Sequence, residues 1–190
     1  MRAEDVARNL ALKGALLEGH FLLSSGLHSD RYMQCARALE DPVLAGELGK
    51  ALAELAPEGV ETVVSPALGG ILIGYEVARN LGARFLFAER EAGKMVLRRG
   101  FALRPGEKTV VVEDVVTTGK STGEVLAVLK EAGAQLLGAL TIVDRSAGAL
   151  SLGVELKSLL RLPLKAFPAD ACPACAAGRP VLKPGSRPLP

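Results

Sequence analysis

Apolar residues recur at helical spacing in several stretches of this chain, and short apolar runs rich in Val and Leu lie between them. Helical spacing predicts helices at 3–17, 42–55, 69–81 and 121–131. The short runs predict strands at 61–64, 84–88, 109–112 and 136–143. Because strands that alternate with helices build a parallel sheet with crossover helices, we expect an α/β fold with a central parallel sheet flanked by helices.

The ends of two predicted helices carry recognisable signals. Asp41 precedes Pro42, which places an N-cap residue before a proline at the first helical position. Ser121 and Glu124 have the spacing of a capping box, and Gly133 follows the end of the same helix. These residues predict helices that begin at 42 and 121.

Three segments do not fit the helix–strand alternation. Residues 21–34 predict short strands around a loop at 24–26. Residues 94–103 contain short β-like pieces around 98–100 and predict a flexible β-hairpin. The chain after residue 162 is rich in Pro, Gly and Ala, which predicts an extended surface tail at 163–190.

Length and charge narrow the class of protein. A chain of 190 residues without an internal repeat predicts a single domain, 1–190. The net charge of +2 and the absence of a basic stripe argue against nucleic-acid binding. Basic residues do gather between Arg90 and Lys108, and this cluster indicates a small anionic ligand.

Hydropathy and cysteine content indicate a cytoplasmic enzyme without a membrane partner. No apolar run approaches the ~20 residues that cross a bilayer. The N-terminal segment carries acids inside a helical pattern, which is not typical of a signal peptide. Three cysteines do not make a disulfide framework.

One string of residues carries the strongest chemical signal. A buried strand is followed by two acids, a short run of hydroxyls with a glycine, and the start of a helix. The open ends of parallel strands bind ligands, and a loop at a helix N-terminus presents N–H groups to a phosphate. Two carboxylates can accept hydrogen bonds from ribose hydroxyls and can stabilise positive charge on a sugar ring. The string is Glu113, Asp114, Val115, Val116, Thr117, Thr118, Gly119, Lys120 and Ser121.

Two other interpretations of this string were weighed. Gly119, Lys120 and Ser121 match the end of a nucleotide triphosphatase loop, but that motif needs a glycine at the position of Asp114. Alternatively, the acids are merely solvated and the hydroxyl run is an ordinary turn. The length of the complete string argues against that second interpretation.

The string resembles the phosphoribosyl pyrophosphate signature of type I phosphoribosyltransferases. The resemblance implies the fold of that family, with Glu113 and Asp114 at the ribose hydroxyls and residues 117–121 around the 5-phosphate. Val115 and Val116 would also contact phosphoribosyl pyrophosphate. Glu113 and Asp114 would also be catalytic, by stabilising the sugar in the transition state. Mg²⁺ would arrive with the pyrophosphate, so no direct protein ligand to the metal is implied.

Residues 21–32, 65–70, 88–94 and 143–145 are similar to segments of the orotate branch of this family. The loop at 90–101 is similar to that of a subgroup found in thermophilic bacteria and archaea. Residues 1–40 resemble the N-terminal hood of the orotate branch. The resemblance implies that orotate binds to Ser25, Gly26, Tyr32, Thr117 and Arg145. A guanidinium such as that of Arg145 matches the orotate carboxylate in a bidentate geometry.

Two loops complete the implied site. Ala67, Leu68 and Gly69 follow a strand where the family has its pyrophosphate loop. Arg90 and Lys94 lie in the segment that corresponds to its mobile basic loop, and Lys94 would be catalytic. The family is homodimeric, with this loop reaching the neighbouring subunit's site, and it acts on orotate and phosphoribosyl pyrophosphate in pyrimidine biosynthesis.

The sequence also departs from the family pattern. Many orotate enzymes have lysines where this chain has Ser24, Gly69 and Glu91. Basic residues of the loop, including Arg98 and Arg99, are candidates to compensate. Two alternatives therefore stay open, a purine or xanthine phosphoribosyltransferase and a regulatory protein that senses phosphoribosyl pyrophosphate.

The remaining cysteines and histidines have weaker patterns. Cys172 and Cys175 form half of a zinc-binding pattern, whereas Cys35 is distant in the sequence. An unused or structural cysteine pair is the expectation, and a metal site or disulfide shared between subunits is the alternative. His20 and His28 are expected to be ordinary surface or turn residues.

Overall fold

The computed structural model describes residues 1–23, 25–146, 150–163 and 165–184. Its centre is a six-stranded sheet in the order β5-β4-β3-β6-β7-β8, parallel except at the β4–β5 pair. The predicted central parallel sheet is therefore confirmed, with one antiparallel edge strand. The strands are β3 (Thr62–Pro66), β4 (Arg84–Glu91), β5 (Lys94–Leu97), β6 (Lys108–Val116), β7 (Gln135–Asp144) and β8 (Leu156–Arg161).

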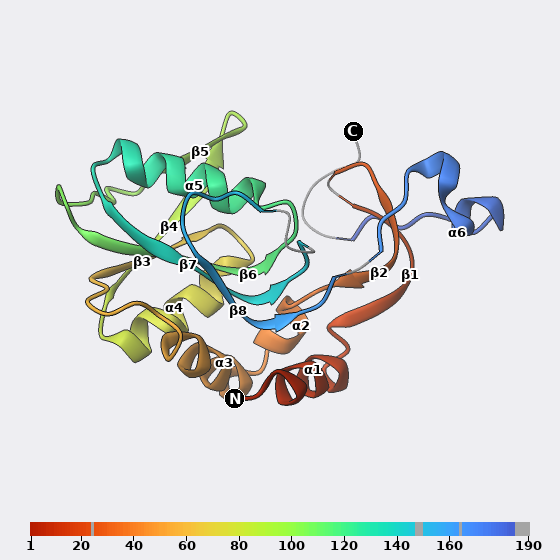
Figure 1. Ribbon diagram of the computed structural model, residues 1–190, viewed down its shortest axis with the longest axis horizontal. Coiled ribbons are helices and arrows are strands. Elements are labelled where there is room, and N and C mark those ends of the chain that lie inside the picture. Colours follow the sequence, from red (N-terminus) through yellow and green to blue (C-terminus); the bar gives the residue numbers. More distant parts are fainter. Residues whose placement is uncertain (24, 147–149, 164, 185–190) are drawn as a thin grey trace.

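Helices cover both faces of this sheet (Figure 1). α3 (Pro42–Ala53) and α4 (Gly70–Leu81) lie on one face, and α5 (Lys120–Glu131) lies on the other. Alternate residues of β3 divide between the two apolar clusters, because Val63 belongs to the α3–α4 side and Val64 to the α5 side. Burial on both faces explains why the strands read as continuous apolar runs. No helix among the described residues is long and apolar enough to cross a membrane.

The predicted helix signals are confirmed at α3, whereas at α5 the glycine after the helix end, Gly133 at φ +78°, is confirmed and the capping box is wrong. The Asp41 carboxylate accepts hydrogen bonds from the backbone N–H groups of Val43 and Leu44, as expected of an N-cap. α5 begins one residue earlier than predicted, and its N-cap is Gly119 at φ +70° without a side-chain cap. Glu124, the second member of the predicted capping box, forms an ion pair with Arg90 instead.

The N-terminal 40 residues, here called the hood, form α1 (Ala3–Leu12), β1 (Leu16–Leu22), β2 (His28–Met33) and α2 (Ala36–Leu39). β1 and β2 make a separate two-stranded antiparallel sheet. The predicted helix 3–17 is too long. Gly14 adopts φ +62° after α1, and Leu16 and Leu17 then pair with β2. A left-handed glycine is a common helix stop, and this strand pairing overrides the helical spacing.

The β4–β5 hairpin turns earlier than the sequence indicated. Its two-residue tip is Ala92 and Gly93, at φ +47° and +82°, which is the signature of a type I′ turn. The segment around Arg98 and Arg99, predicted to be the hairpin tip, is a second turn that follows β5. The Arg98 carbonyl accepts a 2.9 Å hydrogen bond from the N–H of Phe101 in that turn.

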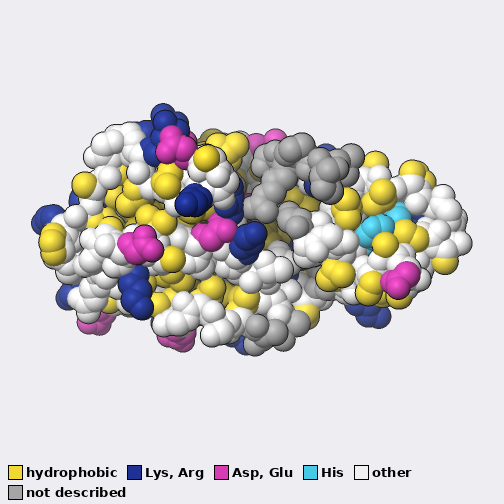
Figure 2. Space-filling view, turned by 90° about the horizontal axis from the view of Figure 1, so that it is seen from above, with side chains coloured by type: hydrophobic (Ala, Val, Ile, Leu, Met, Phe, Trp, Pro, Cys, Tyr) yellow, Lys and Arg dark blue, Asp and Glu magenta, His cyan; other side chains and the backbone are white. Residues whose placement is uncertain are grey.

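The described part of the tail is folded against the hood rather than extended over the surface. It contains η1 (Ala169–Ala171) and the short helix α6 (Pro173–Ala176). The Phe167 segment bridges to β2 and the Leu182 segment bridges to β1. Figure 1 shows the tail and the hood together at one end of the molecule, and Figure 2 shows histidine side chains among apolar side chains at that end.

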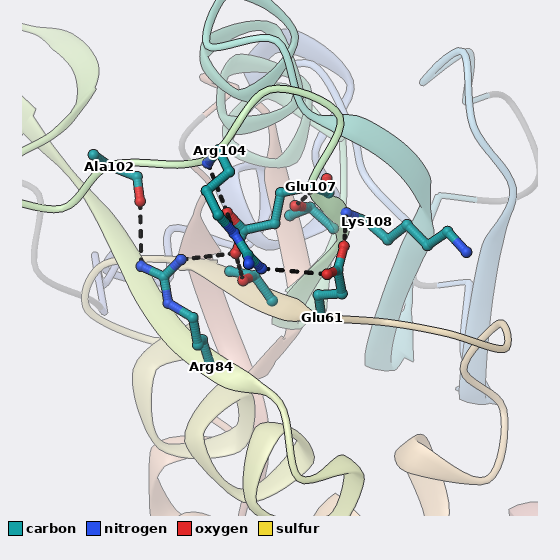
Figure 3. A network of polar contacts seen from close by, with 8 residues as sticks. Glu61, Arg84, Ala102, Arg104, Glu107 and Lys108 are labelled. Atoms are coloured by element: carbon teal, nitrogen blue, oxygen red, sulfur yellow. Dashed lines mark hydrogen bonds and ion pairs between the residues drawn. The ribbon is translucent and has the colours of Figure 1, made fainter.

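A buried carboxylate closes the opposite end of the sheet, where β3, β4 and β6 begin (Figure 3). The Glu107 side chain is fully buried and accepts a hydrogen bond from the Thr62 hydroxyl. It also accepts from the Arg84 guanidinium at 2.7 Å and from the backbone N–H of Arg104 at 2.7 Å. This network joins three strand starts and one loop, so we expect it to contribute to stability rather than to ligand binding.

Candidate active site

Three loops follow neighbouring strands at one edge of the sheet. β6 lies between β3 and β7, and all three strands are parallel. From β3 the chain continues to β4, on one side, and from β6 it continues to β7, on the opposite side. The strand order therefore reverses between β3 and β6, which is where open α/β sheets bind ligands. Three loops meet there. The loop after β3 contains Ala67–Gly69, the loop after β6 contains Thr117–Gly119, and the loop after β7 contains Arg145.

The loop after β3 lies directly on the carboxylate of Asp114. A Cβ atom on Gly69 would come 2.7 Å from Asp114 Oδ1, closer than real Cβ atoms approach an oxygen. Any side chain at position 69, including the lysine common in related enzymes, would displace this carboxylate or the loop. Gly69, which departs from the family pattern, thus leaves the space that the Asp114 carboxylate occupies.

The predicted phosphate-binding residues lie between β6 and α5. Thr117 and Thr118 are exposed, and Gly119 adopts the left-handed conformation that turns the chain into the helix. A Cβ on Gly119 would meet the Leu150 side chain at 2.8 Å, so this position favours glycine for two reasons. The N-terminus of a 12-residue helix and two exposed hydroxyls suit a phosphate group.

Glu113 and Asp114 have different surroundings. β6 continues for two residues past these acids, so their side chains alternate across the sheet. Glu113 accepts a hydrogen bond from the Thr122 hydroxyl of α5, whereas Asp114 faces Gly69. Of these two acids, the structure therefore places only Asp114 against the loop after β3.

Tyr32 of the hood interacts electrostatically with Asp114 of β6 and with Arg145 of the loop after β7. Burial raises the pKa of Asp114, an effect that backbone N–H groups at residues 114 and 115 oppose. Burial also raises the pKa of Tyr32, and the charge of Asp114 raises it further. A carboxylate withdrawn from water interacts strongly with positive charge that develops near it.

Arg145 is a buried cation beside these groups. It is 8% exposed, and burial lowers its pKa. Its Nε atom has no hydrogen-bond partner among the described residues. Its backbone N–H donates to the Val116 carbonyl at 2.8 Å, which fixes the loop after β7 to the end of β6. A buried guanidinium with an unpaired N–H is suited to an anionic ligand.

One residue near this centre had no signal in the sequence. Cys35 is buried and interacts electrostatically with Asp114 and Arg145. Burial raises the pKa of its thiol well above the ordinary value, so it contributes a neutral side chain to the wall of the site. Only the packing of the hood on the strand ends reveals its position.

The remaining hood candidates lie in the turn between β1 and β2. Ser25 and Gly26 are exposed, and Gly26 adopts φ +82°. The Gly26 N–H donates to the Leu23 carbonyl at 2.9 Å, and the Leu23 N–H donates to the Leu27 carbonyl at 2.8 Å. Ser24, where related enzymes often have lysine, lies outside the described residues.

Three arginines of the β4–β5 hairpin and of the turn after it are paired with acids. Arg90 forms an ion pair with Glu124 and donates to the Gly93 carbonyl at 2.9 Å. Arg98 lies 3.3 Å from Glu91, and Arg99 lies 3.0 Å from a second acid, Glu89. Glu91, where related enzymes often have lysine, therefore has a partner in the hairpin.

Lys94 is exposed at the start of β5 and pairs in register with Glu91. β5 is three strand spacings away from β6, which is about 14 Å at the usual separation of neighbouring strands. Figure 1 shows the hairpin at the sheet edge, apart from the hood. The structure thus does not bring Lys94 together with Asp114 within one chain.

Comparison with known proteins gives a consistent result. A family model described as "Phosphoribosyl transferase domain" matches residues 43–153. The chain is 50% identical over 188 residues to an orotate phosphoribosyltransferase of Desulforamulus reducens, and the match covers 98% of both chains. It is 56% identical over 177 residues to an orotate phosphoribosyltransferase of Thermotoga petrophila, covering 93% of this chain and 95% of that protein.

A solved structure has the same fold. The crystal structure of orotate phosphoribosyltransferase from Aeropyrum pernix matches with a TM-score of 0.67 and 31% sequence identity. The match covers 83% of this chain and 93% of that chain. The sheet and its flanking helices are therefore those of an established enzyme fold.

Proposed function

This chain belongs to the phosphoribosyltransferase family, in its orotate branch, and we propose that Asp114, Arg145 and Tyr32 form the centre of its active site. The enzyme transfers the 5-phosphoribosyl group from phosphoribosyl pyrophosphate to orotate, giving orotidine 5′-monophosphate and pyrophosphate. The observation that carries the site assignment is the buried Arg145 with its unpaired Nε, which interacts with Tyr32, as Asp114 does.

Orotate that has lost its N1 proton to solvent forms a bond from N1 to C1 of the sugar, and the bond from C1 to the pyrophosphate oxygen breaks. The electrons of the broken bond leave with pyrophosphate, and positive charge develops on the sugar in the transition state. Asp114 is placed to stabilise that charge, because its carboxylate is partly withdrawn from water. Glu113, fixed by Thr122, is proposed to contact the ribose from the α5 side.

The phosphate groups are assigned to the two loops beside Asp114. Residues 115–121 offer backbone N–H groups, hydroxyls and the N-terminus of α5 to the 5-phosphate. Gly69 lies against Asp114, and residues 67–69 are assigned to the pyrophosphate. These assignments account for the two exposed threonines and for the glycine next to the carboxylate.

The base is assigned to the space between the hood and the loop after β7. Arg145 is proposed to bind the orotate carboxylate, since a guanidinium and a carboxylate form two parallel hydrogen bonds. Tyr32, Ser25, Gly26 and Thr117 are assigned to the rest of the base. A neutral purine offers no carboxylate to Arg145, which is why the purine alternative is not favoured.

Magnesium fits this site as a partner of the substrate. The loop residues offer hydroxyl and N–H groups, which bind phosphate oxygens, whereas Mg²⁺ prefers oxygen ligands from carboxylates, phosphates and water. The phosphate oxygens of the substrate would therefore hold the ion, and it would neutralise charge on the departing pyrophosphate. No direct protein ligand is assigned to it.

Lys94 is proposed to act in the site of a second subunit. Its separation from β6 in the sheet order argues against contact with Asp114 of the same chain. A homodimer in which each hairpin reaches the neighbouring strand ends would place the Lys94 ammonium at the pyrophosphate. The product is the precursor of uridine monophosphate, so the reaction belongs to pyrimidine biosynthesis, and we place it in the cytoplasm.

Orotate-dependent turnover is the direct test of this function. The purified protein with phosphoribosyl pyrophosphate and Mg²⁺ is expected to consume orotate, followed by its ultraviolet absorbance, and to release pyrophosphate. Adenine, hypoxanthine and xanthine serve as controls and are expected to give no nucleotide. Turnover of one of these purines without turnover of orotate would overturn the assignment.

Replacing Arg145 with alanine is expected to weaken orotate binding by about 1.5–3 kcal/mol, the range for a hydrogen bond to a charged group. Binding of phosphoribosyl pyrophosphate should change much less, because only the base carries the carboxylate. Calorimetric titration of each ligand measures both effects. Arg145→Lys keeps the charge but loses the planar fork, so it should recover only part of the affinity. Equal weakening of orotate binding and phosphoribosyl pyrophosphate binding would contradict the assignment of Arg145 to the orotate site.

A further inference from the structure

Four potential metal ligands meet between the hood and the tail. His20 of β1, His28 of β2, and Cys172 and Cys175 of the α6 segment place one ligand atom each within 4.8 Å of all the others. His20 and His28 were expected to be ordinary surface or turn residues, and that expectation is wrong, because both are buried in strands beside the cysteine pair. The histidines lie about 150 positions before the cysteines, with separations of 152 and 155 residues from His20.

The distances among these atoms match a tetrahedral zinc site. Cys172 Sγ and Cys175 Sγ lie 3.5 and 3.6 Å from His20 Nε2, and Cys175 Sγ lies 3.2 Å from His28 Nδ1. Bond lengths of about 2.3 Å to sulfur and 2.0–2.1 Å to nitrogen imply tetrahedral S–N edges of about 3.5 Å and an N–N edge of about 3.3 Å. The two imidazole nitrogens are 2.8 Å apart, so a shift of about half an ångström would complete the tetrahedron.

The surroundings of His20 favour metal binding through Nε2. The Nδ1 atom lies 2.9 Å from the Arg179 carbonyl and is placed to donate its hydrogen there. A hydrogen bond of this kind fixes the tautomer and leaves the other nitrogen to bind a metal. His20 and Cys172 are each 4% exposed and His28 is 9% exposed, so these ligands are largely removed from water.

A disulfide between Cys172 and Cys175 accounts for less of this arrangement. Both thiols are free in the structure. A disulfide would use two sulfur atoms and give no reason for two buried imidazoles to turn the ring nitrogens His20 Nε2 and His28 Nδ1 toward them. Four convergent N and S ligands are instead the donor set that proteins use for Zn²⁺.

We propose that His20, His28, Cys172 and Cys175 bind one Zn²⁺ ion as a structural site that fastens the tail to the hood. Four protein ligands leave no open position, which distinguishes a structural from a catalytic zinc. Backbone hydrogen bonds also join the tail to the hood at the two histidines. The Leu182 N–H donates to the His20 carbonyl at 2.7 Å, and the His28 N–H donates to the Phe167 carbonyl at 2.8 Å.

The site has a consequence for the hood. β1 and β2 form an isolated two-stranded sheet, which is only marginally stable without further support. The metal would join both strands to α6 (Figure 1) and thereby support the strand that carries Tyr32. The inference does not depend on the proposed base or on Lys94, because metal content is measured without substrate.

Metal analysis of the untagged protein tests the proposal. We expect about one zinc per chain, retained through dialysis, and a loss of at least about tenfold in occupancy for Cys172→Ser. Cys175→Ser is a second variant at an exposed ligand, in case the buried substitution prevents folding. Cys35→Ser is the matched control, because it removes a buried cysteine outside the cluster and should keep the metal.

Cobalt exchange examines the geometry directly. The wild-type protein loaded with Co²⁺ should show the visible bands of a tetrahedral ion and a thiolate-to-metal charge-transfer band, and the band should weaken in Cys175→Ser. Chelation should lower the thermal midpoint and speed proteolysis within residues 165–184. A reduced wild-type protein that holds no zinc and gives no such cobalt spectrum would overturn the proposal. So would a Cys172–Cys175 disulfide in the freshly purified protein.

Discussion

Replacing Lys94 with alanine is expected to lower kcat by on the order of 10²-fold or more, the loss typical of one transition-state charge donor. The proposed partner of Lys94, pyrophosphate, gains charge only as its bond to the sugar breaks. An interaction that strengthens in the transition state affects kcat, whereas uniform binding would affect KM. Lys94 is exposed at the start of β5, so the thermal midpoint should hardly change.

Steady-state kinetics with orotate measure this effect, and Lys50→Ala is the matched control. Lys50 is an exposed lysine near the end of α3, on a helix that takes no part in the proposed site. Its removal should leave kcat at the wild-type value. A wild-type kcat in Lys94→Ala would instead identify Lys94 as a solvated loop charge.

A mixing experiment decides whether Lys94 acts within its own subunit. A heterodimer of Lys94→Ala with Asp114→Asn has one intact site if the hairpin is shared, and none if each subunit uses its own lysine. Random reassociation of equal amounts should then restore about a quarter of wild-type activity, since half of the dimers are mixed and each has one working site. Activity no higher than that of the separate variants would contradict the shared hairpin.

Replacing Glu107 with glutamine is expected to lower the free energy of unfolding at pH 7 by up to about 3 kcal/mol, the equivalent of its shift in pKa. Burial by itself would raise the pKa of this carboxyl. Hydrogen bonds from Thr62 and from the Arg104 N–H, together with the charges of Arg84 and Arg104, outweigh burial and lower the pKa from 4.5 to about 2. The Glu107 side chain is fully buried, whereas the Arg84 and Arg104 side chains are 47% and 68% exposed, so solvent screens part of their charge and the full shift sets the upper bound of the effect.

The sign of this shift sets the pH dependence. A carboxyl whose pKa is lower in the folded state stabilises the protein above its unfolded pKa of 4.5, and this stabilisation is lost as the pH falls from 4.5 to about 2. Denaturant unfolding should therefore show a large difference between wild type and Glu107→Gln at pH 7 and a smaller one at pH 3. Glu131→Gln, at an exposed position, should match wild type at both pH values. If wild type and Glu107→Gln differ equally in free energy of unfolding at pH 7 and pH 3, the effect comes from packing rather than from charge.

Much of the fold followed from local patterns. The strands at 61–64, 109–112 and 136–143 were predictable because residues buried on both faces must be apolar along the whole strand. Asp41 predicted the start of α3 because its carboxylate satisfies backbone N–H groups two and three residues away. Errors appeared where a nonlocal partner competed with the pattern. Leu16 and Leu17 follow the helical spacing but pair with β2, and Glu124 pairs with Arg90 instead of capping its own helix.

The sequence by itself determined the chemical character of this protein, because the string from Glu113 to Ser121 brings acids, hydroxyls and a helix start together within nine consecutive positions. Local patterns did not show which distant groups share a site: the family resemblance implied that Tyr32 and Arg145 do, and the tertiary structure decided their contacts. It placed Gly69 against the Asp114 carboxylate and set Arg145 beside Tyr32. It also brought His20 to the cysteines of the tail. Such pairs leave no local signal, because the spacing of residues along a strand or helix carries no information about which other element packs on it.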